Sequence, residues 1–192
     1  MGSVSSIAHS CGRTGRSGLL GRFRRDRNGS VAIEFTMLAI PFSMLVFAIL
    51  ESCIAFAGQE VLANATDDIA RQMRTGQIKT INQVDLEQLV CDRLDIIVSQ
   101  DCPGLSVDLR SFDTFEQAAK FSFRISGDKV VLTNNGSDDE FDVKLGPASS
   151  KNMLRVFYKW PVMTDFMSKY LSNMDDGTTL HFASMTWQNE PY

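Results

Sequence analysis

A lone carboxylate, Glu34, stands inside the most apolar stretch of the chain. Residues 31–57 are mainly apolar, with only Glu34 and Glu51 charged, and residues 35–50 carry no charge at all. An unpaired carboxylate inside an apolar helix costs several kcal/mol and is usually kept only where it meets a partner. Glu34 is the fifth residue counted from Ser30. We therefore expect the carboxylate of Glu34 to have a specific partner.

The four cysteines differ in their surroundings. Cys11 lies in the basic N-terminal segment and Cys53 lies near the end of the apolar stretch, so neither is well placed to pair. Cys91 and Cys102 both follow that stretch, and an oxidising compartment would permit a disulfide between them. Such a bond would stabilise the fold by roughly 3 kcal/mol in the chain-entropy model. We expect this disulfide, and two buried thiols are the alternative.

Residues suited to catalysis are scarce. Beyond the apolar stretch the sequence holds one histidine, His181, and its apolar neighbours Leu180 and Phe182 favour a core or edge-strand imidazole over a catalytic one. The sequence has no nucleotide-binding loop or metal-ligand motif, so we predict no catalytic, cofactor-binding or metal-binding residues. The basic N-terminal residues lack interleaved aromatic residues, which argues against nucleic-acid binding. The sequence thus predicts a protein that is not an enzyme.

The apolar stretch predicts a helix that crosses a membrane. A hydrocarbon core of ~30 Å needs ~20 mainly apolar residues at ~1.5 Å each, and residues 31–57 supply this length. Residues 1–29 hold six arginines and one aspartate, a formal charge of +5, so the rest must carry −9 to give the total of −4. Because basic residues stay on the cytoplasmic side, we expect the N-terminus inside and the acidic remainder outside. Glu51 is then expected to reach headgroup water, and a buried contact with another subunit is the alternative.

Further elements are expected beyond the membrane. Apolar residues at every fourth position predict that the helix continues to Gly76, a total of about 46 residues. Thr80 and Gln83, spaced as in a capping box, predict a second helix. Strands are expected at residues 105–112, 130–133, 153–160 and 178–187, loops at residues 134–139 and 173–177, and a short helix within residues 162–171. The predicted fold class is α+β, with a long N-terminal transmembrane helix, a second helix and a small antiparallel β-sheet packed on the emerging part of the long helix.

The residues around Glu34 resemble a known processing signal. A basic leader ends in Gly29, and residues 30–35 (Ser-Val-Ala-Ile-Glu-Phe) open an apolar helix with glutamate at its fifth position. This pattern resembles the type IV prepilin signal. Together with Pro41, the segment is similar to the TadE-like proteins of tight-adherence (Flp) pilus systems. Further similarity to these proteins lies in residues 59–76, residues 156–161 (Val-Phe-Tyr-Lys-Trp-Pro) and residues 187–192 (Trp-Gln-Asn-Glu-Pro-Tyr).

The resemblance implies how the chain is processed and where it works. It implies that a prepilin peptidase cuts between Gly29 and Ser30, and that the Glu34 carboxylate meets the freed amine of a neighbouring subunit. The implied domains are a basic leader peptide, a transmembrane helix and a periplasmic pilin-like α+β domain, at residues 1–29, 30–57 and 58–192.

The function implied by the resemblance is that of a minor pseudopilin. Such a protein has no enzymatic activity, is held in the inner membrane by a single helix with a cytoplasmic N-terminus, and assists assembly of a Flp-type pilus. Its implied partners are the prepilin peptidase, other pilins and pseudopilins, and the inner-membrane assembly platform.

Other interpretations of the same residues stay open. Residues 55–57 (Ala-Phe-Ala) form a site for ordinary signal peptidase, which would release residues 58–192 as a secreted domain but leave Glu34 unexplained. An uncleaved single-pass signal anchor, with a periplasmic domain that binds a ligand or partner, is the other alternative. A mature chain that begins at Ser30 distinguishes the prepilin-like interpretation from both.

Overall fold

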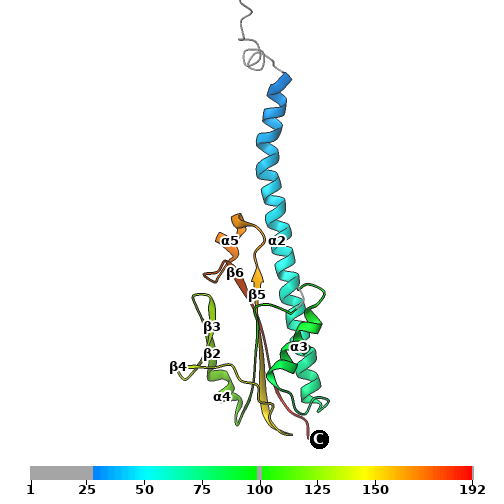
Figure 1. The fold of residues 1–192 in the computed structure, drawn as a ribbon, viewed down its shortest axis with the longest axis vertical. Coiled ribbons are helices and arrows are strands. Elements are labelled where there is room, and N and C mark those ends of the chain that lie inside the picture. Colours follow the sequence, from blue (N-terminus) through cyan, green and yellow to red (C-terminus); the bar gives the residue numbers. More distant parts are fainter. Residues whose placement is uncertain (1–27, 99–100, 192) are drawn as a thin grey trace, which may run out of the picture. The chain divides into compact units, whose positions relative to one another are not determined.

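The apolar stretch and the residues after it form one helix. In the computed structural model, which describes residues 28–98 and 101–191, helix α2 spans Asn28–Arg74 and continues through Pro41 (Figure 1). The chain turns just beyond it at Gly76, whose φ of 73° is a left-handed conformation that glycine adopts without steric cost. The chain divides into two compact units, Met1–Phe47 and Ala48–Tyr192. The predicted long helix that stops before Gly76 is confirmed.

The second helix, α3, spans Gln83–Leu94. Its N-cap is Asn82, whose side-chain oxygen accepts a hydrogen bond from the backbone N–H of Asp85 at 2.8 Å. The helix was therefore predicted correctly, but the cap at Thr80 is wrong. Asparagine is as good a cap as threonine, and the helix begins at the residue that follows it.

The larger sheet has three antiparallel strands in the order β1-β5-β6. Strand β1 spans Leu105–Phe112, β5 spans Lys151–Pro161 and β6 spans Thr178–Gln188. Helix α5, Asp165–Leu171, lies in the connection between β5 and β6. These three predicted strands and the predicted short helix are confirmed, as is the α+β fold class.

The strand predicted at residues 130–133 is confirmed as β3 (Lys129–Asn134), but it belongs to a second sheet that was not predicted. Strands β2 (Phe121–Ser126), β3 and β4 (Ser137–Asp139) form this sheet in that order, and helix α4 (Phe115–Lys120) precedes it. Asn135 and Gly136, with φ values of 49° and 86°, make the two-residue turn that returns β4 onto β3. The prediction of one sheet is therefore wrong, and so is the loop predicted over all of residues 134–139.

Strand β5 is the centre of the fold, because it is buried on both faces. Its residues from Asn152 to Tyr158 are all buried. Every second side chain packs against α2 and α3, where the core residues include Leu62, Ile69, Met73, Leu86, Val90, Leu154, Val156, Tyr158 and Trp160. The alternate side chains pack against the second sheet, where the core residues are Phe121, Leu132, Met153 and Phe157. Figure 1 shows the resulting layers, with α3 and the adjoining part of α2 on one side of β5 and the strands β2, β3 and β4, with helix α4, on the other.

A buried ion pair lies between the two sheets. The side chains of Asp108 on β1 and Arg155 on β5 are 0% and 2% exposed, and their closest N–O distance is 2.8 Å. Arg110 also binds Asp108, at 2.9 Å, and binds Asp139 of β4 at 2.8 Å. Both guanidinium groups lie over the ring of Phe121 on β2, with their central carbons 4.2 and 4.4 Å from its centroid. Burial lowers the pKa of Arg155, and its contacts with Asp108 oppose that effect.

Candidate functional site

The N-terminal part of α2 exposes its apolar side chains. Val31, Phe35 and Met37 have 70%, 71% and 73% of their surface exposed, and further large apolar side chains are exposed as far as Phe56. Within the residues that the structure describes, α2 is the one helix long and apolar enough to cross a membrane, and none of the residues in its most apolar part is buried. An exposed apolar surface of this size is normally covered by lipid or by other subunits. This apolar segment is the candidate functional site.

The residues predicted for processing and contact lie at the start of this segment. Gly29 and Ser30 belong to the first turn of α2, and Glu34 lies one turn further along it. The side chain of Glu34 is exposed among apolar neighbours. The leader before Asn28, which includes Cys11, lies outside the described residues.

Glu51 follows the uncharged stretch and is buried, with 7% of its surface exposed. One oxygen accepts hydrogen bonds from the backbone N–H groups of Met163 and Thr164 at 2.6 and 3.2 Å, and the other accepts the Thr164 hydroxyl. Thr164 is the N-cap residue of α5, so Glu51 satisfies donors at the start of that helix. The expectation that Glu51 reaches headgroup water is wrong, because the chain's own turn before α5 supplies its partners.

Gly58 and Gln59 join α2 to the larger sheet. A Cβ at Gly58 would lie 2.6 Å from the Trp160 ring, which is closer than two such carbons can approach, so glycine permits this contact. The Gln59 side-chain amide donates to the carbonyl of Phe182 at 2.8 Å and accepts from its N–H at 3.2 Å. It thereby bonds the outer edge of β6 as a neighbouring strand would. These contacts fix residues 48–74 of α2 to the sheet.

His181 is a core residue, as the sequence predicted. It is 6% exposed, and its ring stacks on Trp160 with centroids 5.0 Å apart and an interplanar angle of 12°. Burial lowers the pKa of its imidazole below the ordinary value of 6.5. Its Nδ1 is buried without a hydrogen-bond partner among the described residues, which is consistent with an imidazole that stays neutral in the folded protein.

Acid is therefore expected to destabilise the fold through His181. As the pH falls below about 6.5, the unfolded chain binds a proton that the folded chain does not, so unfolding is favoured. His181→Phe keeps an aromatic ring against Trp160 and removes the titrating group. Thermal unfolding of the full chain in detergent, at about pH 7.5 and about pH 5.5, should show a larger fall in midpoint for the wild type than for the variant. Equal falls in the unfolding midpoint would contradict the assignment of the acid sensitivity to His181. The other histidine, His9, is present in both proteins and so cannot cause a difference between them.

The C-terminal residues fasten the sheet to α2. The indole N–H of Trp187 donates to the side-chain oxygen of Asn189 at 2.8 Å, and the Asn189 amide donates to the carbonyl of Gly146 at 2.8 Å. The backbone N–H of Glu190 donates to the carbonyl of Arg74, the last residue of α2, at 2.9 Å. The side chains of Arg74 and Glu190 also form an exposed ion pair. The motif at the end of the chain therefore has a structural role here.

Cys91 of α3 and Cys102 form a disulfide, with their Cα atoms 5.8 Å apart. The bond ties α3 to the turn that leads into β1. Cys53 is a free and exposed thiol on α2. The structure thus contains the disulfide that the sequence predicted.

Acidic residues near β4 form ion pairs. Asp138 pairs with Arg124, and Asp139 pairs with Arg110, each at 2.8 Å. In the part of the chain that the structure describes, no three His, Cys, Asp or Glu side chains are grouped to hold a metal ion. These carboxylates are therefore explained by their arginine partners.

One long apolar helix that continues into a disulfide-bonded α+β unit fits a protein with a single-pass membrane anchor. A family model described as TadE-like protein matches residues 29–71, which are most of α2. This match supports a TadE-like protein and confirms the resemblance over residues 29–71, while the similar segments at residues 156–161 and 187–192 lie outside the matched part. The family is not an enzyme family, and it points to a role related to Tad pili and to pilus-related partners. Comparisons with curated proteins and with solved structures found no match.

Proposed function

We propose that the chain is a minor pseudopilin that assists assembly of a Flp, or tight-adherence, type IV pilus. The observation that carries the proposal is the TadE-like match over residues 29–71, because it begins at Gly29 and covers the apolar helix with Glu34. The protein acts by binding other subunits and has no enzymatic role. Its partners are a prepilin peptidase, other pilins and pseudopilins, and the inner-membrane assembly platform.

The first step is removal of the leader. A prepilin peptidase hydrolyses the peptide bond between Gly29 and Ser30, which leaves residues 1–29 as a free peptide and a new ammonium group on Ser30. The basic leader, the glycine before the cut and the fifth-position glutamate support this step. The mature chain is then held in the inner membrane by α2, with its α+β domain in the periplasm. Residues 30–57 and 58–192 are the proposed bounds of these two parts.

The second step is contact between subunits. The Glu34 carboxylate of one subunit binds the Ser30 ammonium of a neighbour, so that each charge offsets the desolvation of the other. The exposed apolar side chains around Glu34 supply the rest of the contact, because they are covered by no other part of the described chain. Such a pair fixes the register of neighbouring helices.

Cleavage by ordinary signal peptidase after Ala57 fits the contacts of α2 poorly. A cut there would separate Glu51 from the domain and leave the backbone N–H groups of Met163 and Thr164 without this acceptor. It would also make Gly58 the first residue of the released domain, so the new chain end would lie at the two residues, Gly58 and Gln59, that contact Trp160 and Phe182. The contacts of residues 51–59 therefore favour a mature chain that keeps the whole helix.

Replacing Gly29 tests the proposed processing in cells that contain a prepilin peptidase. Gly29→Leu puts a bulky side chain at the cut and should leave the full-length precursor in the membrane fraction. Gly21→Leu makes the same change earlier in the leader and should be processed as the wild type is. Immunoblots of membrane fractions measure both. Normal processing of Gly29→Leu, or equal retention of the two variants, would count against the proposed site and favour the uncleaved signal anchor.

A further inference from the structure

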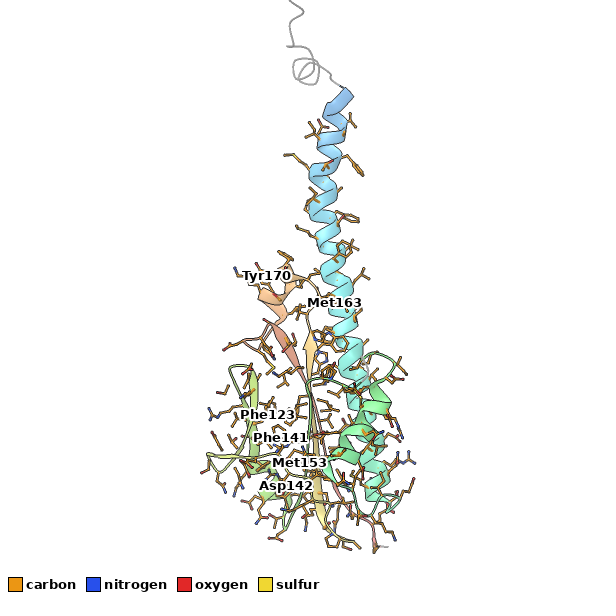
Figure 2. The ribbon with its side chains drawn as sticks, in the orientation of Figure 1. Phe123, Phe141, Asp142, Met153, Met163 and Tyr170 are labelled. Carbon is orange, nitrogen blue, oxygen red and sulfur yellow. A yellow bond between two sulfur atoms is a disulfide. The ribbon has the colours of Figure 1, made fainter. Side chains whose placement is uncertain are left out.

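Three large apolar side chains are exposed within eight residues around α5. Met163, Phe166 and Tyr170 have 69%, 54% and 70% of their surface exposed. Phe166 and Tyr170 lie four residues apart on one face of α5, and their rings pack together with centroids 5.7 Å apart. Met163 lies directly before Thr164, the N-cap residue of α5. We call these three side chains the α5 face. Figure 2 marks both ends of it, with Met163 beside α2 and Tyr170 farther from it.

The α5 face is tied to a defined level of α2. Glu51 binds the backbone of Met163 and Thr164 and the hydroxyl of Thr164, so the start of α5 is held at Glu51. Residues 31–50, which directly precede Glu51, contain Glu34 as their one charged residue. At ~1.5 Å per residue, these twenty helical residues span about 30 Å, the thickness of a hydrocarbon core. Glu51 therefore falls where the hydrocarbon ends, and the α5 face falls at the same level.

The hydrogen bonds of Glu51 are what a carboxylate at the edge of the hydrocarbon needs. A carboxylate at the edge of the hydrocarbon is costly if it must find its partners in lipid. Here two backbone N–H groups and one hydroxyl satisfy it within the chain. The same bonds hold α5 beside the membrane helix, so burial of Glu51 and placement of the α5 face are one structural feature.

We propose that the α5 face binds the surface of the lipid bilayer on the side of the α+β domain. Met163 and Phe166 enter the boundary between headgroups and acyl chains, and Tyr170 keeps its hydroxyl toward water, as tyrosine does in the aromatic belts of membrane proteins. This inference rests on the proposed membrane span of α2. Its consequence is a second attachment that fixes how the domain is oriented on the membrane before it meets other subunits.

The charges around α5 indicate which lipid headgroups the α5 face needs for binding. Asp165 and Lys169, both exposed, give α5 no net charge, and Asp175 and Asp176 follow in the connection to β6. Binding is therefore apolar in origin and does not need anionic headgroups. Zwitterionic phosphatidylcholine is expected to serve as well as bilayers that contain phosphatidylglycerol.

Fluorescence quenching on the full chain in phosphatidylcholine vesicles tests the inference. In a Cys11→Ser, Cys53→Ser background, the disulfide-bonded cysteines do not react, so Tyr170→Cys accepts one environment-sensitive fluorophore. A spin label at a shallow acyl position should remove most of its emission, and aqueous iodide should remove little. Val84→Cys is the matched control, because Val84 of α3 is 71% exposed and should respond to iodide alone. The same pattern is expected when phosphatidylglycerol is added.

A third label separates this inference from the proposed membrane span. Phe42→Cys lies in the apolar stretch and should be quenched by deep acyl spin labels. Quenching of the Phe42 label by lipid together with a Tyr170 label that behaves like Val84 would overturn the α5 inference alone. Failure of lipid quenching at Phe42 would overturn the span and this inference with it. A Tyr170 label shielded from both quenchers, with disulfide cross-linking of two Tyr170→Cys chains, would show that a second copy covers the face and would also overturn the proposal.

Discussion

Replacing Asp108 by asparagine is expected to lower the free energy of unfolding by about 3–5 kcal/mol, because it leaves a buried guanidinium without its countercharge. Asp108 accepts hydrogen bonds from Arg155 and Arg110 and from the backbone N–H of Asp142. Asparagine keeps the size of the side chain but not the charge. Arg155, at 2% exposure, cannot turn to water without opening the contact between the two sheets.

The Asp138–Arg124 pair is the matched control for this prediction. Both side chains are more than half exposed, and the pair has the same N–O distance of 2.8 Å. Asp138→Asn should therefore cost only about 0–1 kcal/mol. Urea unfolding of the full chain in detergent, with the disulfide intact, compares the two variants.

A double variant tests the physical reason for the loss. In Asp108→Leu with Arg155→Met, neither buried charge remains, and apolar replacements of a buried pair often restore stability. The double variant should be more stable than Asp108→Asn. Equal stability of Asp108→Asn and Asp138→Asn would mean that the buried pair does not hold the sheets together.

The second large effect concerns assembly. If the Glu34 carboxylate binds the Ser30 ammonium of a neighbouring subunit, Glu34→Gln leaves a buried cation uncompensated, which costs about 3–5 kcal/mol. A loss of 3–5 kcal/mol corresponds to a fall in the association constant of roughly 10²- to 4 × 10³-fold. Cleavage after Gly29 should persist, whereas cross-linking to partner pilins and the number of surface pili should fall. Membrane insertion should not suffer, because removing a charge makes the apolar segment easier to insert.

Glu60→Gln is the control on the same helix. Glu60 is exposed and lies beyond the apolar stretch, so its loss should leave cross-linking and pili unchanged. Normal cross-linking and normal pili in the Glu34→Gln strain would show that this carboxylate takes no part in assembly. The signal-anchor alternative would then gain support.

Local patterns predicted most of the secondary structure. Helix α2 follows from unbroken apolar residues and four-residue spacing, and strands β1, β5 and β6 follow from β-branched and aromatic residues between turns. The Asn135-Gly136 pair is a strong signal for a two-residue hairpin turn, and it would have revealed β4. The turn-forming asparagine, glycine, serine and aspartate residues of the segment favoured the interpretation of all of residues 134–139 as a loop.

Long-range contacts could not be predicted from the sequence in the same way. Glu51 carries no sign that its partners lie in the turn before α5, because that contact depends on how β5 ends beside α2. Asp108 and Arg155 look like surface residues of two separate strands, and their burial follows from the second sheet. A single-sheet interpretation leaves one face of β5 in water and gives such a pair no role.

The mass of the intact mature protein tests the central claim most directly. The chain would be purified from membranes of cells that contain a prepilin peptidase and analysed by intact-mass spectrometry without reductant. We predict a chain of residues 30–192 that begins at Ser30, with or without one methyl group on its amine, and with the Cys91–Cys102 disulfide intact. A chain that begins at Gly58, or a full-length chain in the presence of the peptidase, would contradict the assignment as a processed pseudopilin.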